Sequence, residues 1–250
     1  MRKMGVFLGL LVILSLTALA DYTYAFHWSR AAGQDLEINV CNTAEIETNY
    51  SLKLYDPWGK LVWETTAKLQ PFDAAYHTVS EQVLEGESLW GMAIVTSTTP
   101  VLIGLQYMLQ GKPQSLDLVG PLCLTCTSAP AFVIPVYYTQ VPGSQTAIIV
   151  MNPNAQGIKG RLAIYQSDGK VAIQGTFQLA AYESNSYSLA KLVGEGTKFW
   201  GLATVLSEGG PVAVAMKFLV EGSLYVQHAG LPIPLQAAPA TPTPQPPRKE

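Results

Sequence analysis

An internal repeat with a single inserted residue constrains the fold of this chain more than any other feature. Residues of the first half recur 110 positions later, and after one inserted residue they recur 111 positions later. The matching pairs include Asn42 and Asn152, Tyr55 and Tyr165, Trp90 and Trp200, Gly91 and Gly201, and Pro100 and Pro211. A solenoid unit usually spans roughly 20 to 50 residues, whereas this period suits a whole domain of immunoglobulin size. The sequence therefore predicts two tandem copies of one domain.

Each copy consists of short runs in which apolar and polar residues alternate. Leu36, Ile38 and Val40 alternate with polar neighbours in the first copy, and the second copy answers with the run 148–150. Such alternation over four to eight residues is typical of half-buried strands, and on this pattern Trp63 is placed on an inward face. No long stretch has a helical period. With six to eight short strands in each copy, the sequence predicts an all-β fold of two tandem β-sandwiches.

Turn residues separate the alternating runs at equivalent places. Asp56-Pro57-Trp58-Gly59 and Gln166-Ser167-Asp168-Gly169 each end in a glycine, which can adopt positive φ and close a tight hairpin. Pro100 and Pro211 each precede an apolar run, as expected for proline at the start of a strand.

The two ends of the chain differ in composition from the repeats. Residues 1–20 have a positive start, an apolar run and a small-residue site at Ala18-Leu19-Ala20, which predicts a signal peptide that is cleaved before Asp21. A retained membrane anchor is the alternative, although the apolar run is shorter than the roughly 20 residues that a span prefers. Residues 234–250 are proline-rich, which predicts a stiff, solvated tail.

Between these ends the sequence predicts three segments: a first sandwich at 22–120, a connector at 121–132 and a second sandwich at 133–233. Because each repeat holds a full set of strands, we expect each sandwich to fold as its own unit.

Composition limits the partners. Charged residues make up 13% of the chain and hydrophobic residues 48%, with a formal net charge of −3. The chain lacks the clustered Lys and Arg on which phosphate binding relies, which argues against nucleic acid. No apolar run after residue 20 is long enough to span a membrane. An exported protein with few charges presents much neutral surface, which favours association with an envelope or extracellular protein or with a polysaccharide.

Part of each copy resembles a known family. An apolar strand that ends in Asn42, the run Leu52-Lys53-Leu54-Tyr55-Asp56, then Ala93–Ser97 and Pro100-Val101 are similar to the sensory rhodopsin transducer family. The likeness covers about 75 residues of each copy and consists of strand rhythm and turn positions. It implies a small β-sandwich. That family is cytoplasmic and has a single module, so the resemblance implies neither a signalling role nor a site residue here.

Catalytic motifs are not recognisable. The chain has no G-x-S-x-G, H-E-x-x-H, phosphate-binding loop or dinucleotide fingerprint. Two of its three histidines, His27 and His77, are replaced by tyrosine in the second copy, which indicates half-buried strand positions instead of metal ligands. Glu85 and Glu195 correspond but are expected in a solvated loop. We therefore predict no enzymatic activity, no cofactor and no metal site, although a hydrolase with carboxylates from distant strands is a further alternative.

The three cysteines fall into two groups. Cys41 corresponds to Met151 at the end of a strand, which predicts a buried and inert thiol. Cys123 and Cys126 lie in the connector and have no counterparts. In an oxidising compartment such a pair most often closes on itself, so a Cys123–Cys126 disulfide is expected. Free or intermolecular thiols and a redox or metal role are the alternatives.

Aromatic residues that differ between the copies are the candidate binding residues. Trp58 replaces Asp168 at a hairpin tip, where an exposed indole can stack on a sugar ring or anchor a protein partner; the alternative is that it folds back over Pro57 or Tyr55. His27 and Trp28 near the mature start are weaker candidates of the same kind. The sequence thus favours an exported, non-enzymatic binding or structural module in the periplasm, on the cell surface or outside the cell. A carbohydrate-binding protein that uses loop aromatics is the second interpretation. The oligomeric state and the ligand do not follow from the sequence.

Overall fold

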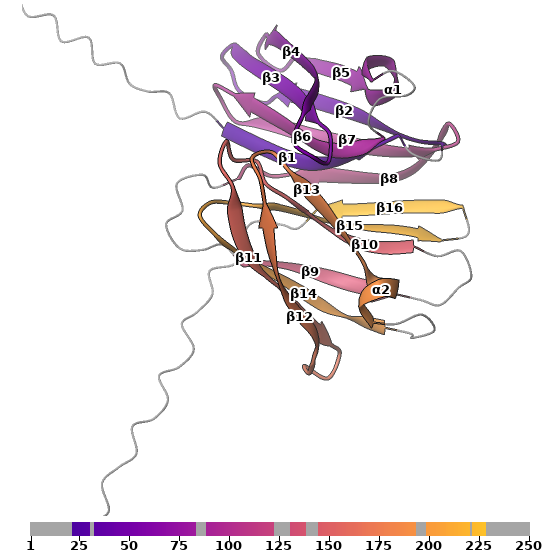
Figure 1. Ribbon diagram of the computed structural model, residues 1–250. Helices are drawn as coiled ribbons and strands as arrows, with labels where there is room; N and C mark the ends of the chain where they lie inside the picture. The colour runs from indigo at the N-terminus through magenta and orange to yellow at the C-terminus, as the bar shows by residue number, and fades with distance from the viewer. Residues whose placement is uncertain are drawn as a thin grey trace, which may run out of the picture.

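The structure is a computed structural model, and it describes residues 22–30, 33–83, 89–122, 131–138, 145–193, 199–220 and 222–228. The predicted signal peptide, the proline-rich tail and most of the connector lie outside these residues. The described part is almost entirely strand, and the all-β prediction is confirmed (Figure 1).

The first repeat contains eight strands and one short helix. They are β1 (Tyr22–Ser29), β2 (Gln34–Asn42), β3 (Thr48–Tyr55), β4 (Leu61–Leu69), β5 (Ala74–Thr78), α1 (Val79–Gln82), β6 (Trp90–Ser97), β7 (Val101–Leu109) and β8 (Lys112–Val119). Sheet A has the strand order β1-β6-β3-β4, and sheet B has the order β5-β2-β7-β8, with all pairings antiparallel.

The second repeat has the same elements in the same order. They are β9 (Ala131–Tyr138), β10 (Gln145–Met151), β11 (Ile158–Gln166), β12 (Val171–Leu179), β13 (Ser184–Ser188), α2 (Leu189–Val193), β14 (Phe199–Glu208), β15 (Ala213–Val220) and β16 (Ser223–His228). Sheet C is β12-β11-β14-β9 and corresponds to sheet A, and sheet D is β13-β10-β15-β16 and corresponds to sheet B. Strand β9 begins at Ala131, two residues before the predicted start of the second sandwich.

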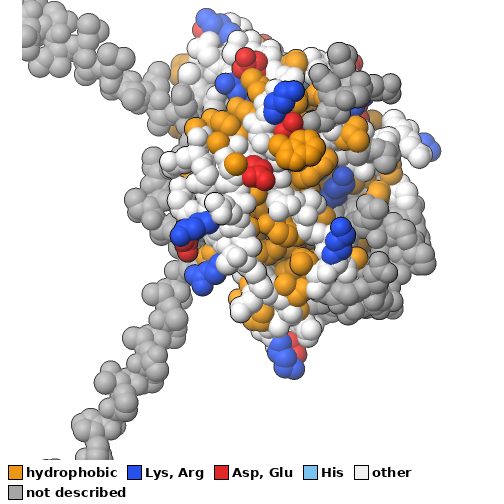
Figure 2. Space-filling model, viewed as in Figure 1, with side chains coloured by type: hydrophobic (Ala, Val, Ile, Leu, Met, Phe, Trp, Pro, Cys, Tyr) orange, Lys and Arg blue, Asp and Glu red, His pale blue; other side chains and the backbone are white. Residues whose placement is uncertain are grey.

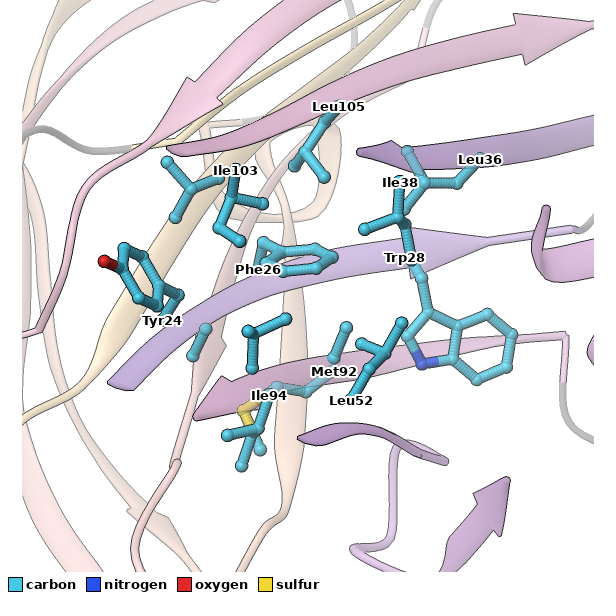
Figure 3. Close-up of a cluster of buried hydrophobic side chains, with 14 of the residues drawn as sticks. Tyr24, Phe26, Trp28, Leu36, Ile38, Leu52, Met92, Ile94, Ile103 and Leu105 are labelled. Carbon is cyan, nitrogen blue, oxygen red and sulfur yellow. The ribbon is translucent and has the colours of Figure 1, made fainter. Parts of the chain in front are cut away.

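The core of the first sandwich lies between sheets A and B. In β2 and β7 every second residue is buried, as the alternating pattern predicts. Figure 3 shows Tyr24, Phe26 and Trp28 of β1 among aliphatic side chains of β2 and β7. Trp63 is partly buried and packs against this cluster, on the inward face that the sequence predicts.

Strand β1 does not alternate, because it is buried on both faces. Its outward side chains and those of β6 belong to the same hydrophobic cluster as residues from the second sandwich. The residues from the second sandwich project from the outer face of sheet D, which is opposite to the face that packs in its own core. They are Ile149, Met151, Ala213, Ala215, Leu224 and Val226. The outer face of sheet A is thus packed on the outer face of sheet D. We call this contact the seam.

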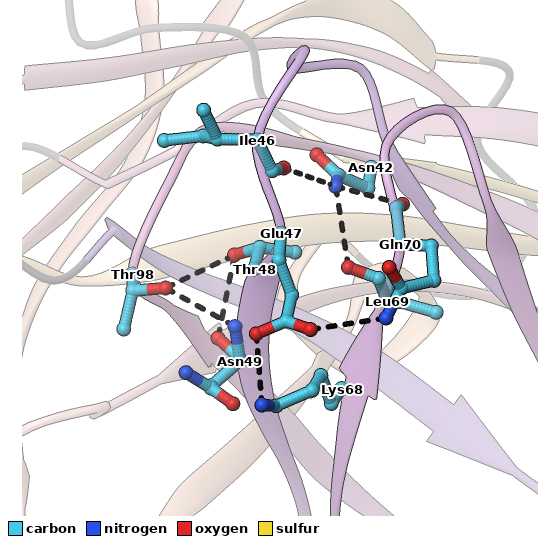
Figure 4. A network of polar contacts seen from close by, with 9 residues as sticks. All are labelled: Asn42, Ile46, Glu47, Thr48, Asn49, Lys68, Leu69, Gln70 and Thr98. Atoms are coloured by element: carbon cyan, nitrogen blue, oxygen red, sulfur yellow. Dashed lines mark hydrogen bonds and ion pairs between the residues drawn. The ribbon is translucent and has the colours of Figure 1, made fainter.

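Residues shared by both repeats satisfy the backbone. The side-chain amide of the buried Asn42 donates to the carbonyls of Ile46, at 2.8 Å, and of Gln70, at 2.9 Å, and so joins two turns (Figure 4). Asn152 donates in the same way to Gln156, at 2.8 Å, and to Ala180, at 2.6 Å. Since a buried amide without such partners would be costly, this pair of asparagines has a structural role.

The shared Trp-Gly pairs include a close backbone approach. A Cβ on Gly91 would lie 1.9 Å from the carbonyl oxygen of Tyr55, and a Cβ on Gly201 would lie 1.8 Å from that of Tyr165. Only glycine allows β6 and β14 to pass the neighbouring strand at this distance.

Candidate functional site

The hairpin between β3 and β4 carries the most exposed tryptophan among the residues whose burial is described. Trp58 is 76% exposed at its tip. The carboxylate of Asp56 accepts hydrogen bonds of 2.9 Å from the backbone N–H groups of Trp58 and Lys60. Gly59 has φ of 84°, as the predicted turn requires. The turn is therefore held by its own backbone and by a buried carboxylate.

The same tip contacts the second sandwich. The N–H of Ser184 donates to the carbonyl of Pro57 at 3.0 Å, and a Cβ on Gly59 would lie 2.3 Å from the carbonyl oxygen of Ala181. Beside it the rings of Tyr55 and Tyr182 stack, with centroids 4.6 Å apart and planes at 14°. Both repeats thus fix the position of the turn that presents Trp58.

A groove of about 530 Å³ lies next to this contact, between the outer face of sheet A and the loop after β10. Hydroxyl, ammonium and amide groups line it together with the stacked tyrosines, and they include Ser51, Lys53, Thr96, Asn154 and Gln156. The pKa of Tyr55 is raised to about 12, chiefly by burial and to a smaller extent by the neighbouring Tyr182 and Glu64. The hydroxyl of Tyr55 is therefore neutral at physiological pH. Such a lining offers an apolar ring face and several hydrogen-bonding groups to a polar ligand.

A second polar cluster is buried in the seam. His228 of β16 bonds through Nδ1 to the carboxylate of Asp117 at 2.8 Å, and its Nε2 accepts the backbone N–H of His27 at 2.9 Å. The hydroxyl of Tyr107 donates to the carbonyl of His27 at 2.6 Å. The carboxylate of Asp117 also accepts the N–H of His228 at 2.7 Å. This cluster joins β1, β7, β8 and β16 across the two sandwiches.

Burial shifts the pKa values of the titratable groups in this cluster. Burial, and then the neighbouring charge of Lys217, holds the pKa of His27 well below its usual value, so the ring of His27 is neutral. Burial tends to raise the pKa of Asp117, but hydrogen bonds from the ring and from the backbone N–H of His228 outweigh this effect and lower the pKa. Burial also lowers the pKa of Lys217 to about 8, while its ammonium donates to Gln34 at 2.5 Å and to Ser29 at 3.3 Å. Because His27 and His228 are buried, a substrate cannot reach them for acid–base chemistry. The cluster instead holds the two sandwiches together.

Two of the predicted binding residues are corrected by the structure. Trp28 is fully buried, and its indole N–H donates to the carbonyl of Tyr55 at 3.0 Å. His27 is 1% exposed because the second sandwich covers the outer face of β1. Neither can present a ring to a partner on the surface. Trp58 is exposed, and its role in binding stays a prediction.

The prediction of a buried thiol at Cys41 is also wrong. Cys41 is a free, partly exposed thiol on the outer face of sheet B. Its counterpart Met151 is buried only because sheet A covers sheet D, and the described residues contain no equivalent cover for Cys41. The Cys123–Cys126 pair lies outside the described residues, as do Glu85 and Glu195. His77 is half-buried, as expected, and its Nε2 bonds with the hydroxyl of Tyr50 at 2.8 Å.

The seam residues Asp117, Lys217 and His228 were missed as a group. Lys217 interrupts the otherwise apolar run of β15, and this interruption is the one local sequence feature that could have identified a member of the group. Within the described ranges, no group of three or more His, Cys, Asp or Glu residues is placed to hold a metal ion. In the same ranges, no helix is long and apolar enough to cross a membrane. On the face shown in Figure 2, Lys, Arg, Asp and Glu side chains are scattered around hydrophobic side chains and form no patch of one charge.

Comparison with known proteins gives little beyond this geometry. No family model and no curated protein matches the chain. Among solved structures it is similar to a beta-glucuronidase from glycoside hydrolase family 2, with 12% identity, a TM-score of 0.20, and coverage of 84% of this chain and 24% of that one. A putative beta-galactosidase from Bacteroides fragilis matches with 12% identity, a TM-score of 0.18, and coverage of 83% and 32%.

A structure titled BspA_C_mut matches with 10% identity, a TM-score of 0.21, and coverage of 85% of this chain and 91% of that one. This chain spans a third or less of the length of the two glycosidases. At such TM-scores the matches carry no argument about activity. They do not test the resemblance to the sensory rhodopsin transducer family, which stays a prediction.

Proposed function

We propose that this chain is an exported, non-enzymatic protein that acts as a binding or structural module at the cell envelope. The N-terminal signal features, the duplicated sandwich and the lack of a recognisable catalytic motif in the sequence support this function. One observation carries it: Trp58 is 76% exposed, although hydrogen bonds within its turn and from the second sandwich fix the turn. An indole that is exposed and pre-positioned loses little conformational entropy on binding, which is typical of an interface anchor.

An envelope protein partner is the first candidate. The purified chain, the Trp58→Ala variant and a control variant are each crosslinked to native envelope fractions. Tyr225→Ala is the matched control, because Tyr225 is an exposed aromatic on the edge strand β16, away from the hairpin. We expect a specific crosslinked partner with the unchanged chain and the control and its loss with Trp58→Ala. Equal recovery with all three proteins would contradict a role for Trp58.

A polysaccharide ligand is the second candidate, and the groove supports it. Its lining of Tyr55, Tyr182, amides and hydroxyls matches the mixture of ring faces and hydrogen bonds that sugars need. The test is retention on insoluble peptidoglycan and migration in gels that contain soluble glucans. Loss of retention in both Trp58→Ala and Asn154→Ala would favour this candidate, whereas no retention of the unchanged chain would exclude these polysaccharides as ligands.

A further inference from the structure

The seam inside the molecule has an unused equivalent on its surface. Sheet A uses its outer face to bind the outer face of sheet D. By the internal repeat, sheet C is the counterpart of sheet A, and sheet B is the counterpart of sheet D. The outer faces of sheets C and B therefore correspond to the two faces that form the seam. Within one molecule they do not meet, because sheets A and D lie between them. They could meet only between two molecules, and we call that contact a second seam.

Burial differs between the equivalent positions as this relation requires. Met92 of sheet A is completely buried in the seam, whereas its counterpart Leu202 on sheet C is 48% exposed. On the other side, Ala213 of sheet D is buried, whereas its counterpart Leu102 on sheet B is 43% exposed. Covering these two aliphatic side chains with a partner would bury apolar surface, which is favourable.

The loops beside sheet B repeat the pattern. Tyr182, which stacks on Tyr55 in the seam, has φ of 58°, and its counterpart Phe72 has φ of 60°. Phe72 is 71% exposed, and the counterpart of Tyr55 is Tyr165 on sheet C. The turn at Phe72 thus holds the same left-handed backbone conformation as the turn at Tyr182. Among the residues that the structure describes, no ring stacks on Phe72 as Tyr55 stacks on Tyr182.

The charges of the two free faces are complementary. Ser51 and Ala155 both line the groove of the internal seam. Their counterparts are Arg161 on sheet C and Glu45 beside sheet B, and both are exposed. A groove already lies over the matching part of sheet C, with a volume of about 460 Å³, and Arg161 and Tyr165 line it. A second seam would bring the opposite charges of Arg161 and Glu45 to one groove.

We propose that the outer face of sheet C binds the outer face of sheet B of a second copy of this chain, head to tail. Phe72 of one copy stacks on Tyr165 of the next, Leu202 is covered by sheet B, and Glu45 pairs with Arg161. Because the two faces differ, the contact is heterologous and leaves one free face at each end, so that further copies can add. This association does not depend on the ligand of Trp58.

One part of the internal seam has no equivalent between copies. In the seam, backbone N–H groups of β16 donate to side chains of β8: Leu224 donates to the amide oxygen of Gln114 at 3.2 Å, and His228 donates to the carboxylate of Asp117 at 2.7 Å. Their counterparts on β16 are Tyr225 and His228, which carry no carboxylate or amide. The contact between copies is therefore weaker than the internal one and is sensitive to concentration.

The test is sedimentation equilibrium of the purified chain over a range of concentrations. Phe72→Asp blocks the B side and Leu202→Asp blocks the C side, and both residues are exposed, so that folding is preserved. We expect the average mass of the unchanged chain to rise with concentration, and each variant alone to remain a monomer. A mixture of the two variants restores one good contact and gives dimers but nothing larger. Leu89→Ser, at an exposed leucine before β6, is the control and associates normally.

A charge exchange provides the second measurement. Arg161→Glu weakens association by about tenfold or more, and adding Glu45→Arg to the same chain restores it. A chain that remains a monomer at every concentration reached overturns the proposal. The proposal is equally overturned if Phe72→Asp and Leu202→Asp each associate alone, or if the double charge exchange does not restore the contact.

Discussion

The two copies keep the same residue where its side chain satisfies backbone hydrogen bonds, and they differ where the burial of the position differs. Asn42 and Asn152 close the same pair of turns in both sandwiches. In contrast, Cys41 and Met151 occupy one strand position but differ in burial, because only the second is covered by the seam. A comparison of the copies thus separates residues that build a sandwich from residues that join two sandwiches.

The close passage of β6 past β3 predicts an intolerance to any side chain. Gly91→Ala places a Cβ 1.9 Å from the carbonyl oxygen of Tyr55, and Gly201→Ala does the same at Tyr165. Since backbone must shift to relieve the overlap, we expect each change to lower the free energy of unfolding by at least about 2 kcal/mol. Urea unfolding followed by tryptophan fluorescence measures it.

Gly175 is the matched control for these substitutions. It lies within a strand of sheet C, and an added Cβ there meets nothing within 4 Å. Gly175→Ala should leave the free energy of unfolding unchanged or raise it by up to about 1 kcal/mol. If Gly91→Ala behaves like Gly175→Ala, the approach of the two strands is not as close as the structure describes.

The buried ammonium of Lys217 predicts a pH dependence of stability. Its pKa is lowered from 10.5 to about 8 by burial, so between these values the unfolded chain binds more protons than the folded chain. The free energy of unfolding therefore rises with pH across this window, by up to about 2 kcal/mol between roughly pH 7.5 and 9.5. Lys217→Met should remove this rise. Above about pH 10 the effect reverses, because buried tyrosines such as Tyr55 have raised pKa values.

Urea unfolding at several pH values tests this prediction, with Lys191→Met as the control. Lys191 is an exposed lysine at the end of α2. Its replacement should leave the rise intact. Parallel pH profiles for the unchanged chain and Lys217→Met would mean that Lys217 is not desolvated in the folded state.

At the scale of strands and turns, the sequence predicts most of what local pattern determines. Alternation places β2 correctly, β7 begins directly after Pro100 as predicted, and Gly59 and Gly169 have the positive φ that their turns require. The pattern fails to identify β1 as doubly buried, because apolar residues on both faces of a strand do not alternate. It also misplaces His27 and Trp28: Trp28 points into the core of its own sandwich, and the burial of His27 depends on a sheet more than 100 residues away in the chain.

The hairpin tips show the same limit. Both copies form the turn, but only the first tip is docked: a Cβ on Gly59 would meet Ala181, whereas one on Gly169 would meet nothing within 4 Å. The sequence singled out Trp58 because it differs from Asp168, and the residue is exposed. That its turn is held from the second sandwich could not be predicted, since the contact arises from how the two copies pack and not from any local motif.

At the scale of the whole molecule, the seam links the stabilities of the two sandwiches. The hydrophobic cluster of the first sandwich continues into the outer face of sheet D, and Asp117 and His228 bond across the contact. Separate folding of each repeat stays a prediction, and the seam adds a condition to it. Residues 22–122 alone would expose Met92 and Ile94, which are buried in the intact chain.

We therefore expect the intact chain to unfold in one cooperative transition and the fragment 22–122 to unfold at a clearly lower temperature. Each buried side chain that the cut exposes removes roughly 1.5 to 3 kcal/mol of burial free energy, so the loss of several such contacts is large compared with the stability of a small domain. Differential scanning calorimetry of the chain, of the fragments 22–122 and 131–228, and of their mixture measures this.

Addition of the second fragment should raise the unfolding midpoint of the first, because it restores the seam by mass action. Asp117→Ala in the first fragment should weaken that rescue, since it leaves His228 without its carboxylate. Fragments that unfold at the same temperature as the intact chain, with no effect of mixing, would show that the seam contributes nothing to stability and that the two sandwiches are independent.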